Sequence, residues 1–370
     1  MRAMIASSAT GGHIYPALAI AEEIKKRDAG AELLFVGAKW EIGKDIVKSA
    51  GYKQAFIDVS GIDRRNPFKA LKSIAGLARA SGEIKKILKE FNPDICIGTG
   101  GHVSGAVIRI ASKAGIRTII QEQNVMPGMA NKLAEKYAGR VFVGFDDSVW
   151  YFKDRGKVAV SGNPVRAAFS EAAQRRAELR RKYGVADGAF CVLFFGGSQG
   201  ADAINDAAAE IIEQGAGGGG EKARHYILIT GRDLFEDVRA RLAASLPALP
   251  ERVALMDYSE KIYELYAAAD LIVARAGALT VTEIAAGAKA SILIPSPNVT
   301  NNHQYYNAKT LADAGAAVLL LEERIQGGEL AAEISRLADD PEKVKNMGIE
   351  AGKMAKADAA AVIVDEIFGS

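Results

Sequence analysis

The sequence contains little cysteine and no long apolar run. Only Cys96 and Cys191 occur in 370 residues, and each lies inside an apolar, strand-like run. This usage excludes a disulfide-stabilised scaffold and is typical of buried, reduced thiols in a cytosolic protein. No uninterrupted apolar stretch reaches about 18 residues, which argues against a membrane span. The first residues also lack the apolar core of a signal peptide, so we expect a cytosolic protein.

Two common nucleotide motifs are also missing. No Gly-Lys-Ser/Thr follows any glycine-rich turn, which excludes a P-loop. No turn has the spaced G-x-G-x-x-G of dinucleotide-binding domains followed by a suitably placed acid. A nucleotide ligand would therefore have to be held by some other arrangement of backbone amides and side chains.

Charge is distributed unevenly along the chain. Residues 1–163 carry 25 Lys and Arg against 16 Asp and Glu, whereas residues 164–370 carry 22 against 29. A basic first half joined to an acidic second half suggests that the first half faces an anionic partner. The chain is too long for one ordinary hydrophobic core, so we expect two domains.

Short apolar, β-branched runs alternate with amphipathic helical segments throughout. This alternation predicts an α/β fold with parallel sheets covered on both faces, which bind ligands beyond the carboxyl ends of their strands. The predicted strands are 2–7, 33–36, 94–98, 117–121, 140–143 and 158–161 in a first series, and 190–195, 225–230, 252–256, 270–274, 290–294 and 316–320 in a second.

The series breaks at Ser161-Gly-Asn-Pro-Val-Arg166, and a charged helix is predicted over 170–183. We therefore expect domains at 1–163 and 164–340. The segment 341–368 is predicted to be helical, so that 341–370 crosses back to the first domain as a C-terminal helix.

Three glycine-rich turns follow predicted strands. They are Thr10-Gly-Gly-His13, Gly98-Thr-Gly-Gly-His-Val-Ser-Gly105 and Gly196-Gly-Ser-Gln-Gly200. Glycine lets a backbone approach a ligand closely and adopt positive φ. Parallel α/β folds need tight turns in any case, so each turn alone is weak evidence for a ligand site.

The most informative stretch is 270–283. An apolar run ends in Arg275-Ala-Gly277, and a helical pattern with Glu283 on its first turns follows. A strand feeding a helix N-terminus presents unpaired N–H groups and the positive end of the helix dipole, which attract phosphate. A carboxylate close by can accept hydrogen bonds from sugar hydroxyls. The stretch therefore predicts a site for a nucleotide-sugar.

Seven blocks taken together resemble one known family. The blocks are Thr10–His13, Gly100–Gly105, Gln121-Glu-Gln-Asn124, Gly162-Asn-Pro-Val-Arg166, Gly196–Gly200, Arg275–Glu283 and His303-Gln-Tyr-Tyr-Asn-Ala308. They occur in the order found in the peptidoglycan N-acetylglucosaminyltransferases of glycosyltransferase family 28. Members of that family transfer N-acetylglucosamine, with inversion, from UDP-N-acetylglucosamine (UDP-GlcNAc) to the C4 hydroxyl of the muramoyl sugar of undecaprenyl-linked lipid I. The products are lipid II and UDP.

The resemblance implies the GT-B architecture, in which two Rossmann-like, doubly wound parallel-sheet domains face each other across a cleft. The acceptor is then expected on the first domain and the UDP-sugar on the second. No cofactor is expected, and no metal, because no two aspartates are separated by one residue as in the metal motif of the other large glycosyltransferase fold. Amides, dipoles and cations would neutralise the departing diphosphate.

The resemblance also assigns residues to the UDP-GlcNAc site. Gly196, Gly197 and Ser198 would hold the diphosphate, Arg166 and Arg275 are candidate phosphate partners, and Glu283 would bind the ribose. Arg166 is equally open to forming an interdomain salt bridge. The full donor set is Thr10, Gly11, Gly12, Asn124, Arg166, Gly197, Ser198, Gln199, Tyr258, Ser259, Arg275, Ala278, Leu279, Thr280, Glu283, His303 and Gln304.

His13 is the candidate general base, because the attacking hydroxyl needs a proton acceptor with a pKa near the working pH. A helix-capping or phosphate-binding role for His13 is equally open. The expected acceptor contacts are Gly100, Gly101, His102, Ser104 and Asn124. In the first turn Ala9 stands where relatives usually carry glycine, which puts the flexibility of this loop in doubt.

A basic amphipathic helix is predicted after Asn66-Pro67. Such a helix can lie on an anionic bilayer, although an ordinary solvated helix face has the same pattern. Because a lipid-linked acceptor is implied, we expect a peripheral protein at the cytoplasmic face of the bacterial cell membrane. Its expected protein partners are those of cell-wall synthesis and division, and no nucleic-acid partner is expected. The expected membrane-facing residues are Lys69, Lys72, Ile74, Leu77, Arg79, Lys85 and Lys86.

Three alternative functions stay open at this point. One is a related transferase that moves a sugar onto diacylglycerol, and another is a UDP-sugar 2-epimerase of similar fold. The third is a non-catalytic nucleotide-sugar-binding module. A transferase would release UDP only when its acceptor is present, which distinguishes it from an inert module.

Overall fold

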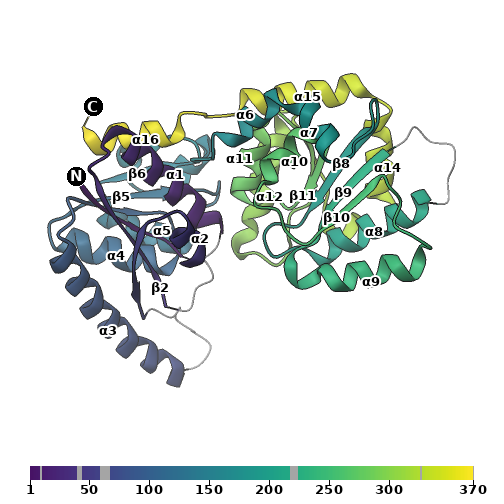
Figure 1. Ribbon diagram of the computed structural model, residues 1–370. Coiled ribbons are helices and arrows are strands. Elements are labelled where there is room, and N and C mark those ends of the chain that lie inside the picture. Colours follow the sequence, from purple (N-terminus) through teal and green to yellow (C-terminus); the bar gives the residue numbers. More distant parts are fainter. Residues whose placement is uncertain (9–10, 40–43, 59–66, 217–223, 326, 370) are drawn as a thin grey trace. The chain divides into compact units, whose positions relative to one another are not determined.

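The computed structural model describes residues 1–8, 11–39, 44–58, 67–216, 224–325 and 327–369. Its backbone separates into two compact units, one made of Met1–Arg166 with Lys356–Ser370 and the other of Ala167–Ala355. Each unit contains a parallel sheet with helices on both of its faces (Figure 1). The α/β class and the two Rossmann-like domains predicted from the sequence are thereby confirmed.

The first unit has seven parallel strands in the order β3-β2-β1-β4-β5-β6-β7. The strands are β1 Arg2–Ala6, β2 Glu32–Ala38, β3 Lys53–Ile57, β4 Ile95–Gly98, β5 Arg117–Glu122, β6 Arg140–Val143 and β7 Val158–Val160. The helices are α1 Gly11–Arg27, α2 Lys44–Ser49, α3 Pro67–Phe91, α4 Gly101–Lys113, α5 Met129–Ala134 and α16 Ala359–Phe368, with short 3₁₀ helices η1 Glu135–Tyr137, η2 Asp146–Tyr151 and η3 Arg155–Lys157.

Alternate residues of each strand fill two apolar layers. In β1, Met4 and Ala6 pack with residues of α3 and α4, whereas Ala3 and Ile5 pack with residues of α1 and α16 on the opposite face. Both faces are covered, so the strands read as nearly continuous apolar runs. This explains why the sequence pattern located most of them.

The second unit has six parallel strands in the order β10-β9-β8-β11-β12-β13. The strands are β8 Phe190–Phe195, β9 Arg224–Ile229, β10 Val253–Met256, β11 Leu271–Ala274, β12 Ala290–Leu293 and β13 Ala317–Leu319. The helices are α6 Ala168–Gln174, α7 Arg176–Lys182, α8 Asp202–Ala216, α9 Phe235–Ser245, α10 Ile262–Ala268, α11 Ala278–Ala286, α12 His303–Asp313, α13 Glu322–Ile325, α14 Glu329–Ala338 and α15 Pro341–Lys353, with 3₁₀ helices η4 Arg232–Leu234 and η5 Thr300–Asn302.

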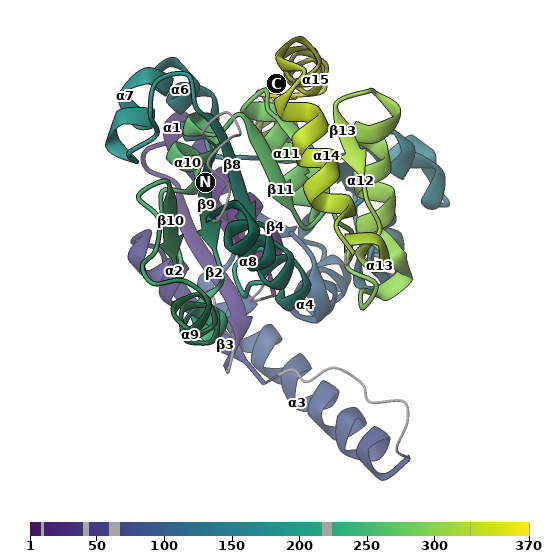
Figure 2. The ribbon, with the colours of Figure 1, turned by 90° about the vertical axis from the view of Figure 1, so that its right-hand side faces the viewer.

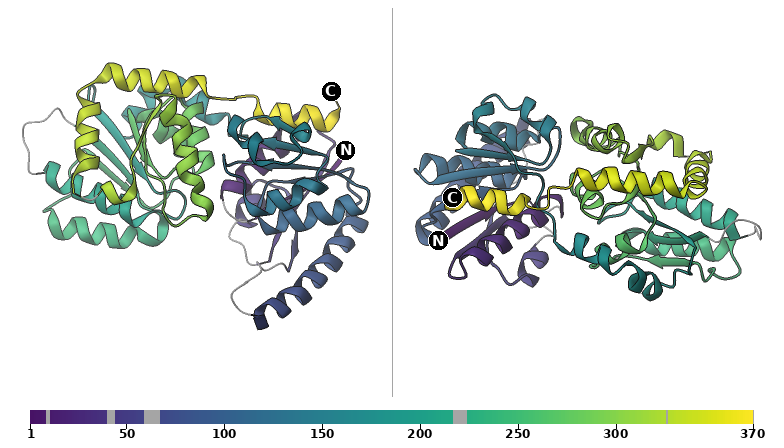
Figure 3. Two further views of the ribbon diagram at one scale, coloured as in Figure 1. Left: turned by 180° about the vertical axis from the view of Figure 1, so that it is seen from behind. Right: turned by 90° about the horizontal axis from the view of Figure 1, so that it is seen from above.

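The C-terminal segment forms two helices where a single helical segment, 341–368, was expected. Helix α15 packs on α11 and β12 of the second unit, and α16 packs on α1 of the first. Ile363, Val364 and Ile367 enter the apolar layer of α1, and Arg117 donates to the Ile367 carbonyl at 2.7 Å. The two chain termini consequently lie near each other in the first unit (Figures 1 and 3).

Both cysteines are buried and unpaired, as predicted. Cys96 lies on β4 and Cys191 on β8. Burial raises the pKa of the Cys96 thiol to about 12, and burial together with the nearby Asp270 carboxylate raises that of Cys191 to about 12. Neither thiol is therefore a nucleophile at neutral pH.

Candidate functional site

In both units the strand order reverses direction at one point, between β1 and β4 in the first and between β8 and β11 in the second. Ligands of open α/β sheets bind beyond the carboxyl ends of the strands at such a switch point. The four loops that follow these strands contain the predicted glycine turns and the Arg275–Gly277 segment. Each unit therefore presents one candidate site.

The glycine loop after β8 has one packed and one open glycine. Gly200 has φ +83°, and a Cβ there would lie 1.9 Å from the Thr230 carbonyl oxygen. Gly197 has φ +91°, and a Cβ there would meet nothing within 4 Å. Ser198 and Gln199 between them are exposed. Gly200 thus packs the loop against Thr230, while the space beside Gly197 is open and a ligand can approach it.

Helix α11 follows β11, which is the neighbour of β8 in the sheet, so the helix starts beside this loop. Gly277 is the N-cap residue of α11, and no side chain caps the helix. The first intrahelical hydrogen bond runs from the Val281 N–H to the Gly277 carbonyl at 3.0 Å. The amides of the predicted residues Ala278, Leu279 and Thr280 have no intrahelical acceptor, as in every α-helix. Glu283 lies half-buried on the second turn. The N-terminus of α11 can thus offer amides to a phosphate.

Arg275 is already engaged within the second unit. Its guanidinium forms an ion pair with Glu322 and donates to the carbonyls of Ile294 and Pro295 at 3.3 and 3.4 Å. Its side chain is only 13% exposed. This arrangement balances the charge of Arg275 and connects the loop after β11 to the loop after β12.

The other predicted donor residues of the second unit follow β10 and β12 at the same edge of its sheet. Tyr258 and Ser259 follow β10 and are half-buried. His303 and Gln304 open α12, where His303 Nδ1 lies 2.9 Å from the Thr300 carbonyl oxygen and Gln304 Oε1 accepts from the Ser296 amide at 2.9 Å. The Gln304 side chain therefore shapes the loop after β12 in addition to any ligand contact.

In the first unit, the turns after β1 and β4 fit closely together. A Cβ on Gly101 would lie 1.9 Å from Ser8 Oγ, and a Cβ on Gly100 would lie 2.5 Å from His13 Cδ2. The Ser8 amide donates to the Gly100 carbonyl at 3.2 Å. The imidazole of His13 thus rests against the second glycine turn. Gly11 and Gly12 begin α1, whereas Thr10 lies outside the described residues.

His102 and Ser104 of α4 differ in exposure. His102 is half-exposed at the start of the helix, but Ser104 is fully buried. A Cβ on Gly98 would lie only 2.3 Å from Ser104 Oγ. The position of Ser104 fits packing beneath the turn better than contact with a ligand.

The Gln121–Asn124 block is mostly internal. Glu122 is 2% exposed, and its carboxylate accepts from the Asn124 and Gly128 amides at 2.9 and 3.0 Å and from Asn131 Nδ2 at 2.8 Å. Gln121 Nε2 donates to Asn163 Oδ1 at 2.9 Å. These buried polar groups join β5 to the loop before α5 and to the segment around Asn163. Within the block only Asn124 is half-buried, whereas the three residues before it are buried.

Arg166 lies at the end of the first unit and faces α1. Its guanidinium carbon lies 5.1 Å from the centre of the Tyr15 ring, a distance typical of a cation–π contact. Burial raises the pKa of Glu22 on the same helix, and the charge of Arg166 partly offsets this shift. Tyr15 therefore holds the guanidinium beside the first turns of α1, the helix that also carries His13.

The predicted membrane-facing residues are described only in part. The side chains of Lys69, Lys72, Ile74 and Leu77 lie outside the described part of the structure. Arg79, Lys85 and Lys86 are exposed on α3, with Arg79 3.8 Å from Asp58 and Lys86 3.8 Å from Glu90. The N-terminal part of α3 extends away from the sheet (Figure 2). None of the described helices is both long and apolar enough to cross a bilayer.

Comparison with known proteins bears on the whole chain. Residues 4–143 match the glycosyltransferase family 28 N-terminal domain, and residues 191–363 match the glycosyltransferase family 28 C-terminal domain. A UDP-N-acetylglucosamine–N-acetylmuramyl-(pentapeptide) pyrophosphoryl-undecaprenol N-acetylglucosamine transferase of Thermoanaerobacter sp. (strain X514) is 39% identical over 360 residues, which cover 97% of each chain.

Two solved structures are similar to the chain over its whole length. MurG of Acinetobacter baumannii is similar over 100% of both chains, with a TM-score of 0.77 and 26% identity. The UDP-GlcNAc 2-epimerase of Neisseria meningitidis also aligns over 100% of both chains, with a TM-score of 0.71 but only 14% identity, so this likeness concerns the fold alone. With both domain matches in order and a full-length relative at 39% identity, the chain belongs to glycosyltransferase family 28.

Proposed function

We propose that this chain transfers N-acetylglucosamine from UDP-GlcNAc to the C4 hydroxyl of the N-acetylmuramyl sugar of undecaprenyl-diphospho-N-acetylmuramyl-pentapeptide, giving lipid II and UDP. The observation that carries this proposal is the 39% identity, over 97% of both chains, to a relative named as that transferase. The reaction needs sites for two substrates that each carry a diphosphate. The two switch points, each lined by glycine turns, support the proposal because they offer one such site in each unit.

The donor would bind the second unit and the acceptor the first. The open residues Gly197 to Gln199 and the amides at the start of α11 suit the diphosphate of UDP, and Glu283 suits its ribose. The transfer is a direct displacement at the anomeric carbon, which inverts its configuration. His13, resting on Gly100 in the first unit, would take the proton from the attacking hydroxyl.

We further propose that no metal is required. The diphosphate that leaves the sugar gains negative charge, which amides, a helix N-terminus and a nearby cation can stabilise. Among the described residues, no cluster of three or more His, Cys, Asp and Glu side chains is placed to hold a metal ion.

A transfer assay with acceptor omission tests the function. The chain is incubated with radiolabelled UDP-GlcNAc and a short-chain lipid I analogue, and both the labelled lipid and free UDP are measured. We expect label in the lipid and UDP release only with acceptor. Release of UDP without acceptor would indicate an epimerase-like reaction, and binding without any release would indicate a non-catalytic module.

Peripheral membrane contact is a second part of the proposal. Exposed apolar side chains gather on two neighbouring elements of the first unit, α5 and η2. Met129 and Leu133 are 55% and 59% exposed, and Trp150 and Tyr151 are 66% and 36% exposed. Lys132 lies over the Tyr151 ring at 5.3 Å and Arg155 over the Trp150 ring at 4.3 Å. We name these six residues the α5–η2 patch.

The α5–η2 patch combines large apolar groups with cations, as surfaces that lie on anionic bilayers do. Serine at both Leu133 and Trp150 should reduce co-sedimentation with anionic vesicles, and charge reversal of Lys69, Lys72 and Arg79 should do the same. Serine at Leu249 and Ile349, which are 42% and 47% exposed on the second unit, is the matched control. Equal sedimentation of all variants would show that these faces are merely solvated.

A further inference from the structure

One loop at the carboxyl edge of the second sheet has no role in the donor site described above. The strand order places β9 between β10 and β8. The segment after β9, Thr230–Leu234, must therefore lie between Tyr258, which follows β10, and the glycine loop, which follows β8. A ligand that spans those two neighbours passes this segment.

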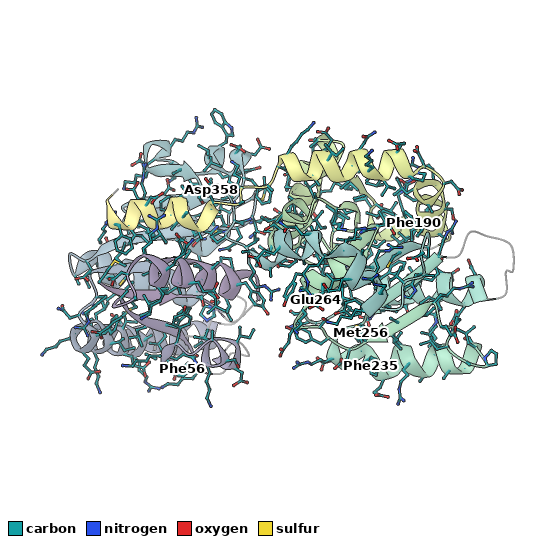
Figure 4. The ribbon with its side chains drawn as sticks, turned by 45° about the horizontal axis from the view of Figure 1, so that its top comes forward. Phe56, Phe190, Phe235, Met256, Glu264 and Asp358 are labelled. Carbon is teal, nitrogen blue, oxygen red and sulfur yellow. The ribbon has the colours of Figure 1, made fainter. Side chains whose placement is uncertain are left out.

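The segment is fixed firmly to both neighbours. A Cβ on Gly231, which has φ +88°, would lie 2.4 Å from the Gln199 carbonyl oxygen. The Thr230 amide donates to the carbonyl of Met256, the last residue of β10, at 3.0 Å (Figure 4 labels Met256). Asn205 Nδ2 donates to the Thr230 carbonyl at 2.9 Å. The residue after Gly231 is thereby held at a set position beside the glycine loop.

That residue is Arg232, and its side chain is exposed. The guanidinium carbon lies 4.6 Å from the centre of the Tyr258 ring. Within the described part of the chain, no carboxylate forms an ion pair with Arg232. Arg275, by contrast, is paired with Glu322. Stacking on tyrosine occupies the face of a guanidinium and leaves the N–H groups at its edge available for bonding.

We propose that Arg232 binds a phosphate oxygen of the donor nucleotide, held in place by Tyr258. This inference rests on the proposed function, since it assumes a UDP-linked donor. Guanidinium and phosphate form short, charge-assisted hydrogen bonds. Arg232 would supply the positive charge that the glycine loop, with its sequence Gly196-Gly-Ser-Gln-Gly200, does not itself contain.

Calorimetric titration of the full chain with UDP and with uridine tests the proposal. Arg232→Ala should weaken UDP binding by about tenfold or more, as expected for loss of a hydrogen bond between charged groups, and should leave uridine binding unchanged. Arg232→Lys should retain part of the UDP affinity. Arg239→Ala is the matched control, because Arg239 is an exposed arginine of the same unit that pairs with Glu236.

Two results would overturn the proposal. Unchanged UDP affinity in Arg232→Ala would remove Arg232 from the site. Equal weakening of UDP and uridine would mean that Arg232 acts on the nucleoside through Tyr258 and not on phosphate. If the wild-type chain fails to bind UDP at all, the proposed function falls, and the inference falls with it.

Discussion

At the scale of single residues, His13 is the candidate general base, and the second glycine turn defines its position. Its ring lies against Gly100, where a Cβ would come within 2.5 Å of it, so the second glycine turn sets where the imidazole can be. His13→Ala should lower kcat by about 100-fold or more, the range of general base catalysis, with UDP-GlcNAc binding little changed. A collapse of donor affinity with kcat preserved at saturating donor would remove His13 as the base.

Lys289 is a buried residue whose charge affects stability. Its Nζ donates to the carbonyls of Ala267 and Ala269 at 3.0 and 2.9 Å. Burial, with the nearby Arg176 guanidinium, lowers the pKa of Lys289 to about 7. The unfolded chain binds this proton more tightly, so the free energy of unfolding should rise with pH from about 7 to about 10.5 and be flat below.

Lys289→Met should remove this pH dependence. Arg176 donates to the same two carbonyls at 2.8 and 2.7 Å, so neither is left without a partner. We expect the variant to unfold at a higher temperature than the wild type near pH 6, and this difference in unfolding temperature to disappear by about pH 10. If the difference in unfolding temperature between variant and wild type stayed constant from about pH 6 to about pH 10, the lowered pKa of Lys289 would be contradicted.

At the scale of loops and helices, glycines of one loop should respond differently to alanine. Gly197→Ala places a methyl group in open space, so only the positive φ opposes it, at a cost of about 1–2 kcal/mol. Gly200→Ala adds a clash with the Thr230 carbonyl oxygen to the same backbone strain. Thermal unfolding should show a clearly larger loss for Gly200→Ala. Equal losses would mean that the loop shifts to make room.

The sequence pattern located most strands because both faces of each sheet are covered and the strands are apolar throughout. It missed β3, Lys53–Ile57, which begins with Lys and Gln and lies at the edge of the sheet. Exposed edge strands carry polar residues, so no apolar run marks them. The end of α15 was also missed, because Met354–Asp358 contains neither glycine nor proline to signal the break before α16.

Side-chain partners were less predictable than the loops that carry them. Glycine turns and the start of α11 could be recognised from local residue types alone. The ion pair of Arg275 with Glu322, and the burial of Gln121, Glu122 and Gln123, depend on segments far apart in the sequence. Arg232 was missed for the same reason, since only the strand order places its loop beside Tyr258.

At the scale of the whole molecule, the two units share the order of their first six strands, to which the first unit adds β7, and each presents a glycine-lined switch point. The basic residues predominate in 1–163 and the acidic ones in the remainder, as suits a lipid diphosphate acceptor at a membrane and a separate donor site. The presence of two units could be predicted from the chain length, and their parallel sheets from the alternation of strand and helix patterns. The two substrates proposed for the chain could not be predicted in this way, because that proposal comes from the resemblance of whole blocks.

The two central properties of the proposed donor site are where the uridine nucleotide binds and whether its binding needs a metal. A crystal structure of the chain soaked with UDP in the presence of EDTA measures both directly. We predict density for the diphosphate over Gly197–Gln199 and the first amides of α11, with the ribose at Glu283. Density at another edge of either sheet, or binding only after a divalent cation is restored, would contradict the account.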